Sequence, residues 1–115
     1  MKKYIPTITV LLLFACTDHD TYPENTAIAK ACKVCHTDLT EMQWLRTLIR
    51  ENNGNVFAIN TSDGVYFVHQ AVYMSCLVCD LYRCSGSKPA SVTDVVQQEL
   101  QHGINKSNLI YEAKY

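Results

Sequence analysis

The chain has 115 residues, a formal net charge of −1 and six cysteines, and this length allows one small domain. It has no basic patch and no interleaving of basic and aromatic residues, which argues against a nucleic-acid partner. A phosphate-binding glycine loop and a G-x-S-x-G motif are both missing from the sequence. These are the commonest enzyme signatures, so the sequence favours a protein that is not an enzyme.

Residues 1–15 have the layout of a bacterial signal peptide. Lys2 and Lys3 form a positive start, and the apolar run 5–14 is about half the length that a transmembrane helix needs. The run ends in Leu-Phe-Ala-Cys, which resembles the lipobox of bacterial lipoproteins. This resemblance implies that Cys16 becomes the first residue of the mature protein and carries acyl chains such as palmitate.

Two consequences follow for the mature chain. Three acyl chains on Cys16 would anchor the protein to a membrane without a spanning helix, and Thr17 at the next position predicts the outer membrane under the well-studied lipoprotein sorting rule. The alternative is an ordinary signal peptide cut near Ala15, and both interpretations predict export. Residues 16–26 are polar and acidic and are expected to form a flexible tether.

The remainder, residues 27–115, is expected to fold as a single α+β domain. Ala27 to Cys32 is apolar enough for a helical turn, and a longer helix is predicted from Leu39 to Asn52, with Asp38 as its N-cap and Trp44 as a core anchor. Valines and aromatic residues around an Asp-Gly turn predict a hairpin. The later elements expected are strands over 56–60, 65–73 and 77–84, a helix from Ser91 to about Gly103, and a final strand over 109–115.

This order, α-β-β-β-α-β, predicts a small antiparallel sheet of about four strands. One or two helices are expected to cover one face of the sheet. In the second helix, an apolar side is predicted from Val92, Val95, Val96 and Leu100.

Five cysteines follow the lipobox, and they are Cys32, Cys35, Cys76, Cys79 and Cys84. An exported protein keeps disulfides, and an odd number allows at most two within the domain. A bridge from the segment before the long helix to the third strand would close a loop of about 40 to 50 residues and stabilise the domain by about 3 to 4 kcal/mol. Structural disulfides are therefore the main prediction, with the connectivity left open.

Cys32, Cys35 and His36 also form the C-x-x-C-H motif of c-type cytochromes. On that resemblance the two cysteines would hold haem c through thioethers and His36 would be the proximal ligand, making the chain a monohaem electron carrier. The distal ligand would then be Met74, His69 or His102. The expected strands and the three further cysteines do not fit a helical cytochrome, so haem is the alternative and no cofactor is the main expectation.

Two other site types deserve less weight. Cys32 and Cys35 could combine with Cys76 and Cys79 as the four thiolates of a zinc ribbon, but an oxidising compartment converts such thiols to disulfides. A thioredoxin-like motif at Cys32 lacks a preceding strand. No metal is therefore expected, and His69 is expected to be a hydrogen-bonded residue of the sheet.

The chain as a whole resembles a group of small bacterial lipoproteins of uncharacterised function. The matching motifs are W-L-x-x-L-I at 44–49, V-Y-x-V at 65–68, L-Y-x-C-x-G at 81–86 and L-I-Y-E at 109–112. The resemblance supports the fold and the disulfides but implies no ligand. The sequence therefore predicts an envelope lipoprotein that acts as a non-enzymatic interaction module, contacting another envelope protein through an exposed sheet face or the hairpin.

Overall fold

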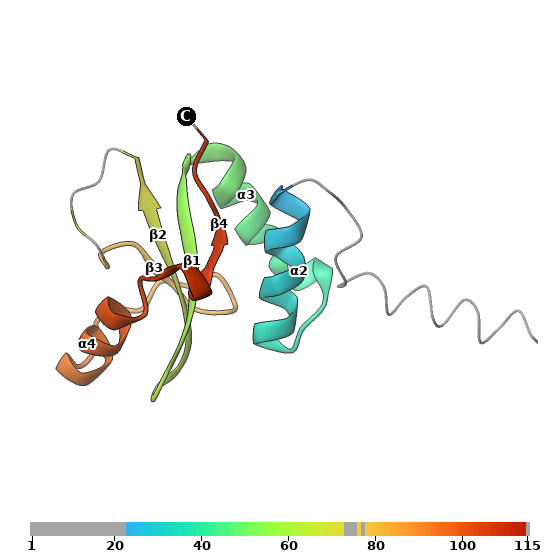
Figure 1. Cartoon of the computed structure of the whole chain (residues 1–115). Coiled ribbons are helices and arrows are strands. Elements are labelled where there is room, and N and C mark those ends of the chain that lie inside the picture. The colour runs from blue at the N-terminus through green and yellow to red at the C-terminus, as the bar shows by residue number, and fades with distance from the viewer. Residues whose placement is uncertain (1–22, 73–75, 77, 115) are drawn as a thin grey trace, which may run out of the picture.

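The computed structural model describes residues 23–72, 76 and 78–114, so the expected signal peptide, Cys16 and Met74 lie outside the described residues. A four-stranded antiparallel sheet in the order β3-β2-β1-β4 forms the centre, as Figure 1 shows. This confirms the predicted α+β class. The elements are α2 (Pro23–Cys35), η2 (Leu39–Met42), α3 (Gln43–Glu51), β1 (Gly54–Thr61), β2 (Gly64–Ala71), β3 (Leu81–Tyr82), α4 (Asp94–His102), η3 (Lys106–Asn108) and β4 (Leu109–Tyr111).

The hairpin of β1 and β2 is the longest regular part of the sheet. The two strands pair along their whole length, from Gly54 opposite Ala71 to Thr61 opposite Gly64. Gly64 has a φ of 103°, a left-handed conformation that glycine adopts without the steric cost of a Cβ atom. The predicted Asp-Gly hairpin is therefore confirmed.

Helix α2 starts earlier than the sequence pattern indicated. It begins at Pro23, so the last four residues of the predicted tether, 23–26, form its first turn. Proline suits this position because it has no N–H to leave without a partner at a helix start. The buried side of α2 consists mainly of small residues, including Ala27, Ala31 and Cys32, which give a weak periodic signal in the sequence.

The helix predicted from Leu39 to Asn52 occurs as two pieces, η2 followed by α3. Asp38 caps η2 as predicted, since its carboxylate accepts a hydrogen bond from the N–H of Glu41 at 3.3 Å. Leu45, Leu48 and Ile49 of α3 are buried.

Helices cover both faces of the sheet, whereas the sequence predicted one face. Val56 and Ala58 of β1 pack with α2 and α3, while their neighbours Phe57 and Ile59 pack with Val96 and Leu100 of α4. Figure 1 shows α4 on the opposite side of the sheet from α2 and α3. The unbroken apolar run in β1 is the physical reason, because a strand buried on both faces needs apolar residues at every position. The exposed sheet face expected as a contact surface is therefore not present in the described part of the chain.

The smaller elements also differ from their predictions. Thr93, and not Ser91, is the N-cap of α4, and Val95 is 63% exposed and lies off the buried side of the helix. The strands predicted over 77–84 and 109–115 shorten to two and three residues. After β4, the N–H groups of Ala113 and Lys114 bond to asparagine side chains of the 53–55 segment.

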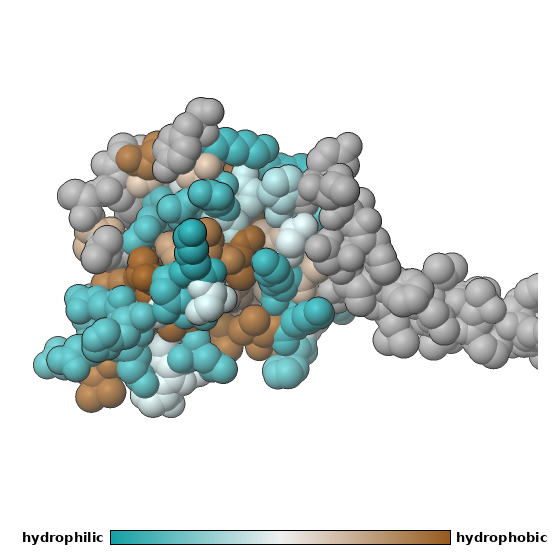
Figure 2. All heavy atoms as spheres, in the orientation of Figure 1, coloured by the Kyte–Doolittle hydropathy of each residue, from teal (hydrophilic) through white to brown (hydrophobic). Residues whose placement is uncertain are grey.

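The surface is mostly polar. In Figure 2 the hydrophobic residues of the visible face form small separate patches between polar side chains. Within residues 23–72, 76 and 78–114, no helix has both the length and the apolar character to cross a bilayer.

Candidate functional site

The C-x-x-C-H motif is the end of helix α2. Cys32 lies in the last turn with 2% of its surface exposed, and Cys35 is the last helical residue. His36 follows with a φ of 55°, and the N–H of Thr37 bonds back to the carbonyl oxygen of Cys32 at 3.1 Å. This backbone arrangement is a common helix C-terminus, in which a left-handed residue lets the chain turn away.

Cys35 forms a disulfide with Cys84, with a Cα to Cα distance of 5.8 Å and a sequence separation of 49. The bridge ties the end of α2 to the segment after β3. It therefore joins the segment before the predicted long helix to the predicted strand over 77–84, as expected from the sequence. A haem thioether at Cys35 would require this bond to be broken, and Cys32 faces the core. The two thiols that a haem needs are therefore not presented together.

Cys76 and Cys79 form a second disulfide, closing a C-x-x-C loop. Both residues are exposed, whereas Cys35 and Cys84 are partly buried. Of the five cysteines after the lipobox, Cys32 is in neither disulfide. The four sulfurs of the zinc hypothesis are thus divided between two disulfides and one core residue. No cluster of three or more potential metal ligands occurs among the residues that the structure describes.

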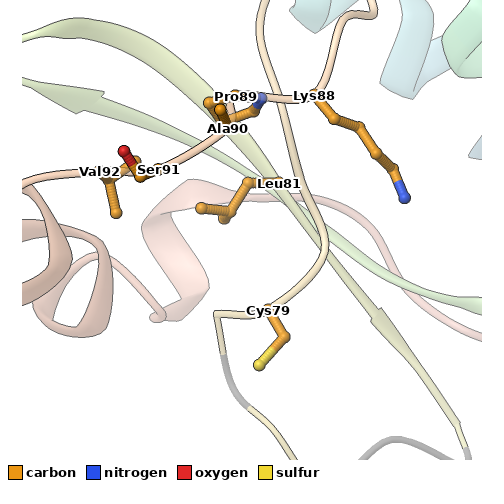
Figure 3. Close-up of a pocket in the computed structure, with 7 residues that line it drawn as sticks. All are labelled: Cys79, Leu81, Lys88, Pro89, Ala90, Ser91 and Val92. Atoms are coloured by element: carbon orange, nitrogen blue, oxygen red, sulfur yellow. The ribbon is translucent and has the colours of Figure 1, made fainter.

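A hollow of about 200 Å³ lies beside Cys79, and we call it the Cys79 hollow. Figure 3 shows Cys79 at one end, Leu81 in the middle and the 89–92 segment along the other side, with the Lys88 side chain pointing away from Val92. The lining residues are Cys79, Leu81, Lys88, Pro89, Ala90, Ser91 and Val92. Most of these side chains are apolar, so the hollow can accept an apolar or extended group next to a disulfide.

A turn brings the two sides of the Cys79 hollow together. After β3 the N–H of Gly86 bonds to the carbonyl oxygen of Arg83, and the N–H of Arg83 bonds to that of Ser87, both at 2.9 Å. Gly86 has a φ of 89°, which favours glycine. The chain then runs back along β3, so that Lys88 reaches Asp80, with Nζ 3.0 Å from Oδ1.

Asp80 is the centre of a polar network directly after Cys79. Its Oδ2 lies 2.9 Å from Nδ1 of the buried His69, and its carbonyl oxygen accepts the backbone N–H of the same histidine at 2.9 Å. Nε2 of His69 lies 2.9 Å from the carbonyl oxygen of Asn52. Tyr82 donates its hydroxyl to Asp80 Oδ2 at 3.2 Å. Both ring nitrogens of His69 thus have partners, which confirms the prediction of a hydrogen-bonded sheet histidine.

This network sets the charge at the site. Burial raises the pKa of the Asp80 carboxyl, but hydrogen bonds from Lys88 and His69 outweigh burial and hold that pKa below its usual value. The hydrogen bond to Asp80 raises the pKa of Lys88, and burial raises that of Tyr82. A paired carboxylate and ammonium therefore persist next to Cys79 at neutral pH.

Cys79 is fixed by the residues on both sides of it. Val78 is buried in the core that faces α4, and Asp80 is bound to the sheet through its carboxylate and its backbone. Cys79 is therefore held in place by its two neighbours in the chain. The sequence indicated the two cysteines but not this support, because the pairing of Asp80 with His69 and Lys88 depends on the β2–β3 register and on the turn at Gly86.

Comparison with known proteins adds no family to this description. Scans of protein-family models, of curated proteins and of solved structures each returned no match.

Proposed function

We propose that the chain is a lipid-anchored protein of the bacterial cell envelope that acts as an interaction module for another envelope component. The two disulfides are the observation that supports this best, because protein disulfides persist in exported proteins and are rare in the cytosol. The lipobox-like sequence at Cys16 and the resemblance to small bacterial lipoproteins supply the anchor and the outer-membrane location.

The fold limits where a partner can bind. Because helices pack on both faces of the sheet, we consider the hairpin end and the hollows of the surface. The hollows around Glu24 are lined by charged side chains that already pair with each other, Glu24 with Arg46 and Arg50. At the hairpin end, Arg83 already pairs with Asp63 and lies over the ring of Tyr66, 4.2 Å from its centroid. Most of the side chains that line the Cys79 hollow are apolar, and the hollow is open to solvent, so we place the interaction surface there.

Anchoring is tested by labelling cells with radioactive palmitate and by separating membranes from soluble extract. We expect label in the intact chain and none in Cys16→Ser, with the variant leaving the membrane fraction. Cys76→Ser is the matched control, because it also removes one sulfur and should keep the label. An unlabelled intact chain would contradict the proposal.

The surface is tested with a photo-reactive residue at Ala90, which lines the hollow, and with the same residue at Gln98 on the exposed side of α4. A discrete cross-linked product from position 90 alone supports the assignment, and equal products from both positions contradict it.

A single absorption spectrum separates this proposal from the electron-carrier alternative. The protein is made in a host that attaches haem covalently. A Soret band that survives acid-acetone extraction would show covalent haem, and would favour a cytochrome over an interaction module.

A further inference from the structure

We infer that Cys76 and Cys79 are a redox-active pair that exchanges its disulfide with the paired thiols of another exported protein. This goes beyond the proposed function, because it gives the interaction module a chemical reaction. It depends on export but not on the lipid.

The two disulfides differ in burial and in the length of the loop that each closes. Cys35 and Cys84 are partly buried and close a long loop, and in the chain-entropy model a longer closed loop restricts the unfolded chain more and so stabilises the fold more. Cys76 and Cys79 are three residues apart, and closing so short a loop stabilises the fold much less in the same model. The Cys35–Cys84 bridge is therefore the one that mainly stabilises the fold, and the Cys76–Cys79 bridge contributes less to stability.

The exposure of Cys76 and Cys79 also favours attack by a thiolate of another protein. Thiol–disulfide exchange requires an attacking thiolate to reach a sulfur along the S–S axis, so exposed disulfides are the labile ones. Both Cys76 and Cys79 are exposed. The hollow lies beside Cys79, which is one of its lining residues (Figure 3). The C-x-x-C spacing is also the one that dithiol oxidoreductases use, because it allows a disulfide and a reduced pair with little backbone change.

Cys79 is also held by the residues that precede and follow it in the chain. The buried Val78 and the bonds of Asp80 to His69 and Lys88 hold Cys79 in place without using its sulfur. After reduction, Cys79 would remain attached to the sheet by these contacts. The fold therefore does not depend on this disulfide staying closed.

The exchange between the partner dithiol and the Cys76–Cys79 disulfide takes place in two steps. A thiolate of the partner attacks one sulfur of the Cys76–Cys79 bond, forming a mixed disulfide and releasing the other cysteine as a thiolate that takes up a proton. The second thiol of the partner loses its proton and attacks the partner sulfur of the mixed disulfide, which releases the remaining cysteine. Two electrons and two protons pass from the partner dithiol to this chain, and the partner gains a disulfide. The segment beside the reacting partner cysteine would occupy the Cys79 hollow.

The test uses the full chain, oxidised and purified in detergent. Samples are equilibrated with increasing ratios of reduced to oxidised glutathione, quenched with acid, alkylated and mapped by peptide mass. We expect Cys76 and Cys79 to become alkylated together at a ratio about tenfold or more below the one that opens Cys35–Cys84, as exposed and buried bridges differ. Fluorescence of Trp44 should stay constant over that range, showing that the domain remains folded.

Transfer is then measured directly with dithiothreitol and with a synthetic peptide that carries two thiols. The oxidised chain should convert one equivalent of peptide to its disulfide, and Cys76→Ser/Cys79→Ser should convert none. Cys76→Ser alone should form a stable mixed disulfide with oxidised glutathione at Cys79, since no second cysteine releases it. Cys32→Ala is the matched control and should transfer like the unmodified chain.

Two results would overturn the inference: opening of both disulfides at the same glutathione ratio, or opening of Cys76–Cys79 only when Trp44 fluorescence reports unfolding. Neither result depends on palmitate labelling, so this proposal and the lipoprotein proposal can fail separately.

Discussion

The indole N–H of Trp44 donates a hydrogen bond to the carbonyl oxygen of Cys84, with the two atoms 3.0 Å apart. The same ring stacks on Tyr82, with centroids 5.4 Å apart. One side chain of α3 thus holds the segment that follows β3, next to the disulfide from α2. The residues of the W-L and L-Y-x-C-x-G motifs therefore meet at one place in the fold, and their role there is packing.

Gly86 should not tolerate a side chain. A Cβ atom at this position would lie 2.6 Å from Cγ of Trp44, and the φ of 89° strains any other residue. We expect Gly86→Ala to lower the free energy of unfolding by about 2 to 3 kcal/mol, measured by urea denaturation. Gly64→Ala is the control, because its φ is also positive but its nearest neighbour is the flexible end of Arg83. It should cost about 1 kcal/mol, and an equal loss in both variants would contradict the packing argument.

The Cys35–Cys84 bridge should carry much of the stability of the domain. Cys35→Ser/Cys84→Ser is expected to lower the free energy of unfolding by about 3 to 4 kcal/mol, because the unfolded chain regains the freedom of a long loop. The matched pair Cys76→Ser/Cys79→Ser should cost about 2 kcal/mol or less. Denaturation curves of the two double variants make the comparison, and the reverse order would show that the short loop is the structural staple.

The Asp80 network should make stability depend on pH in the acid range. The pKa of this carboxyl is lowered in the folded chain from its usual 3.8, so the ionised form stabilises the fold above that value. The contribution is lost as the pH falls below 3.8 through the lowered pKa. We expect Asp80→Asn to cost about 2 kcal/mol at pH 6, where its bonds from Lys88 and His69 are charge-assisted, and progressively less at more acidic pH.

The measurement for this prediction is urea denaturation of both proteins between pH 2 and 7. Introducing Lys88→Met into both proteins should reduce the difference between their free energies of unfolding, because this substitution removes one of the groups that hold the Asp80 carboxylate. A difference that does not vary with pH would mean that Asp80 acts through its shape alone.

Glu24 should join the first turn of α2 to α3. Its carboxylate forms ion pairs with Arg46 and Arg50, and hydrogen bonds from Arg50 and then Arg46 lower its pKa despite partial burial. A double-mutant cycle of Glu24→Gln with Arg46→Met should give a coupling free energy of about 1 kcal/mol. The cycle with Arg50→Met should give less, since the side chain of Arg50 is 63% exposed and that of Arg46 is 20% exposed. Higher salt should reduce both couplings, and coupling that salt does not change would argue against ion pairing.

The parts of the fold that sequence reasoning predicted are those with a local cause. The Asp-Gly turn, the Asp38 cap and the apolar side of α3 each depend on a few neighbouring residues. Helix α2 was predicted only as one turn, because apart from Ile28 its buried side consists of alanines and Cys32, and small residues give a weak pattern. The second covered face of the sheet has a weaker signal, because an apolar run as short as Val56–Ile59 of β1 predicts a strand without showing that both of its sides are buried.

The sequence predicted the cysteines of the candidate site but not the residues that surround them. Five cysteines in a chain that is predicted to be exported indicated disulfides, but the choice of Cys35 over Cys32 follows from the helix, which turns Cys32 into the core and ends at Cys35. His69 and Asp80 are eleven residues apart and meet only across paired strands. Such a contact has no signature in the sequence.

The Cys35–Cys84 bridge also determines how the domain would respond to mechanical load. For a chain held in a membrane at Cys16, tension on the anchor enters the domain at Pro23. Only the 13 residues of α2, Pro23–Cys35, can be pulled out, a length of about 40 Å, because the covalent bridge then passes the force directly to Cys84. The helix α3 and the hairpin lie inside the closed loop, so they stay out of the line of force while the bridge is intact.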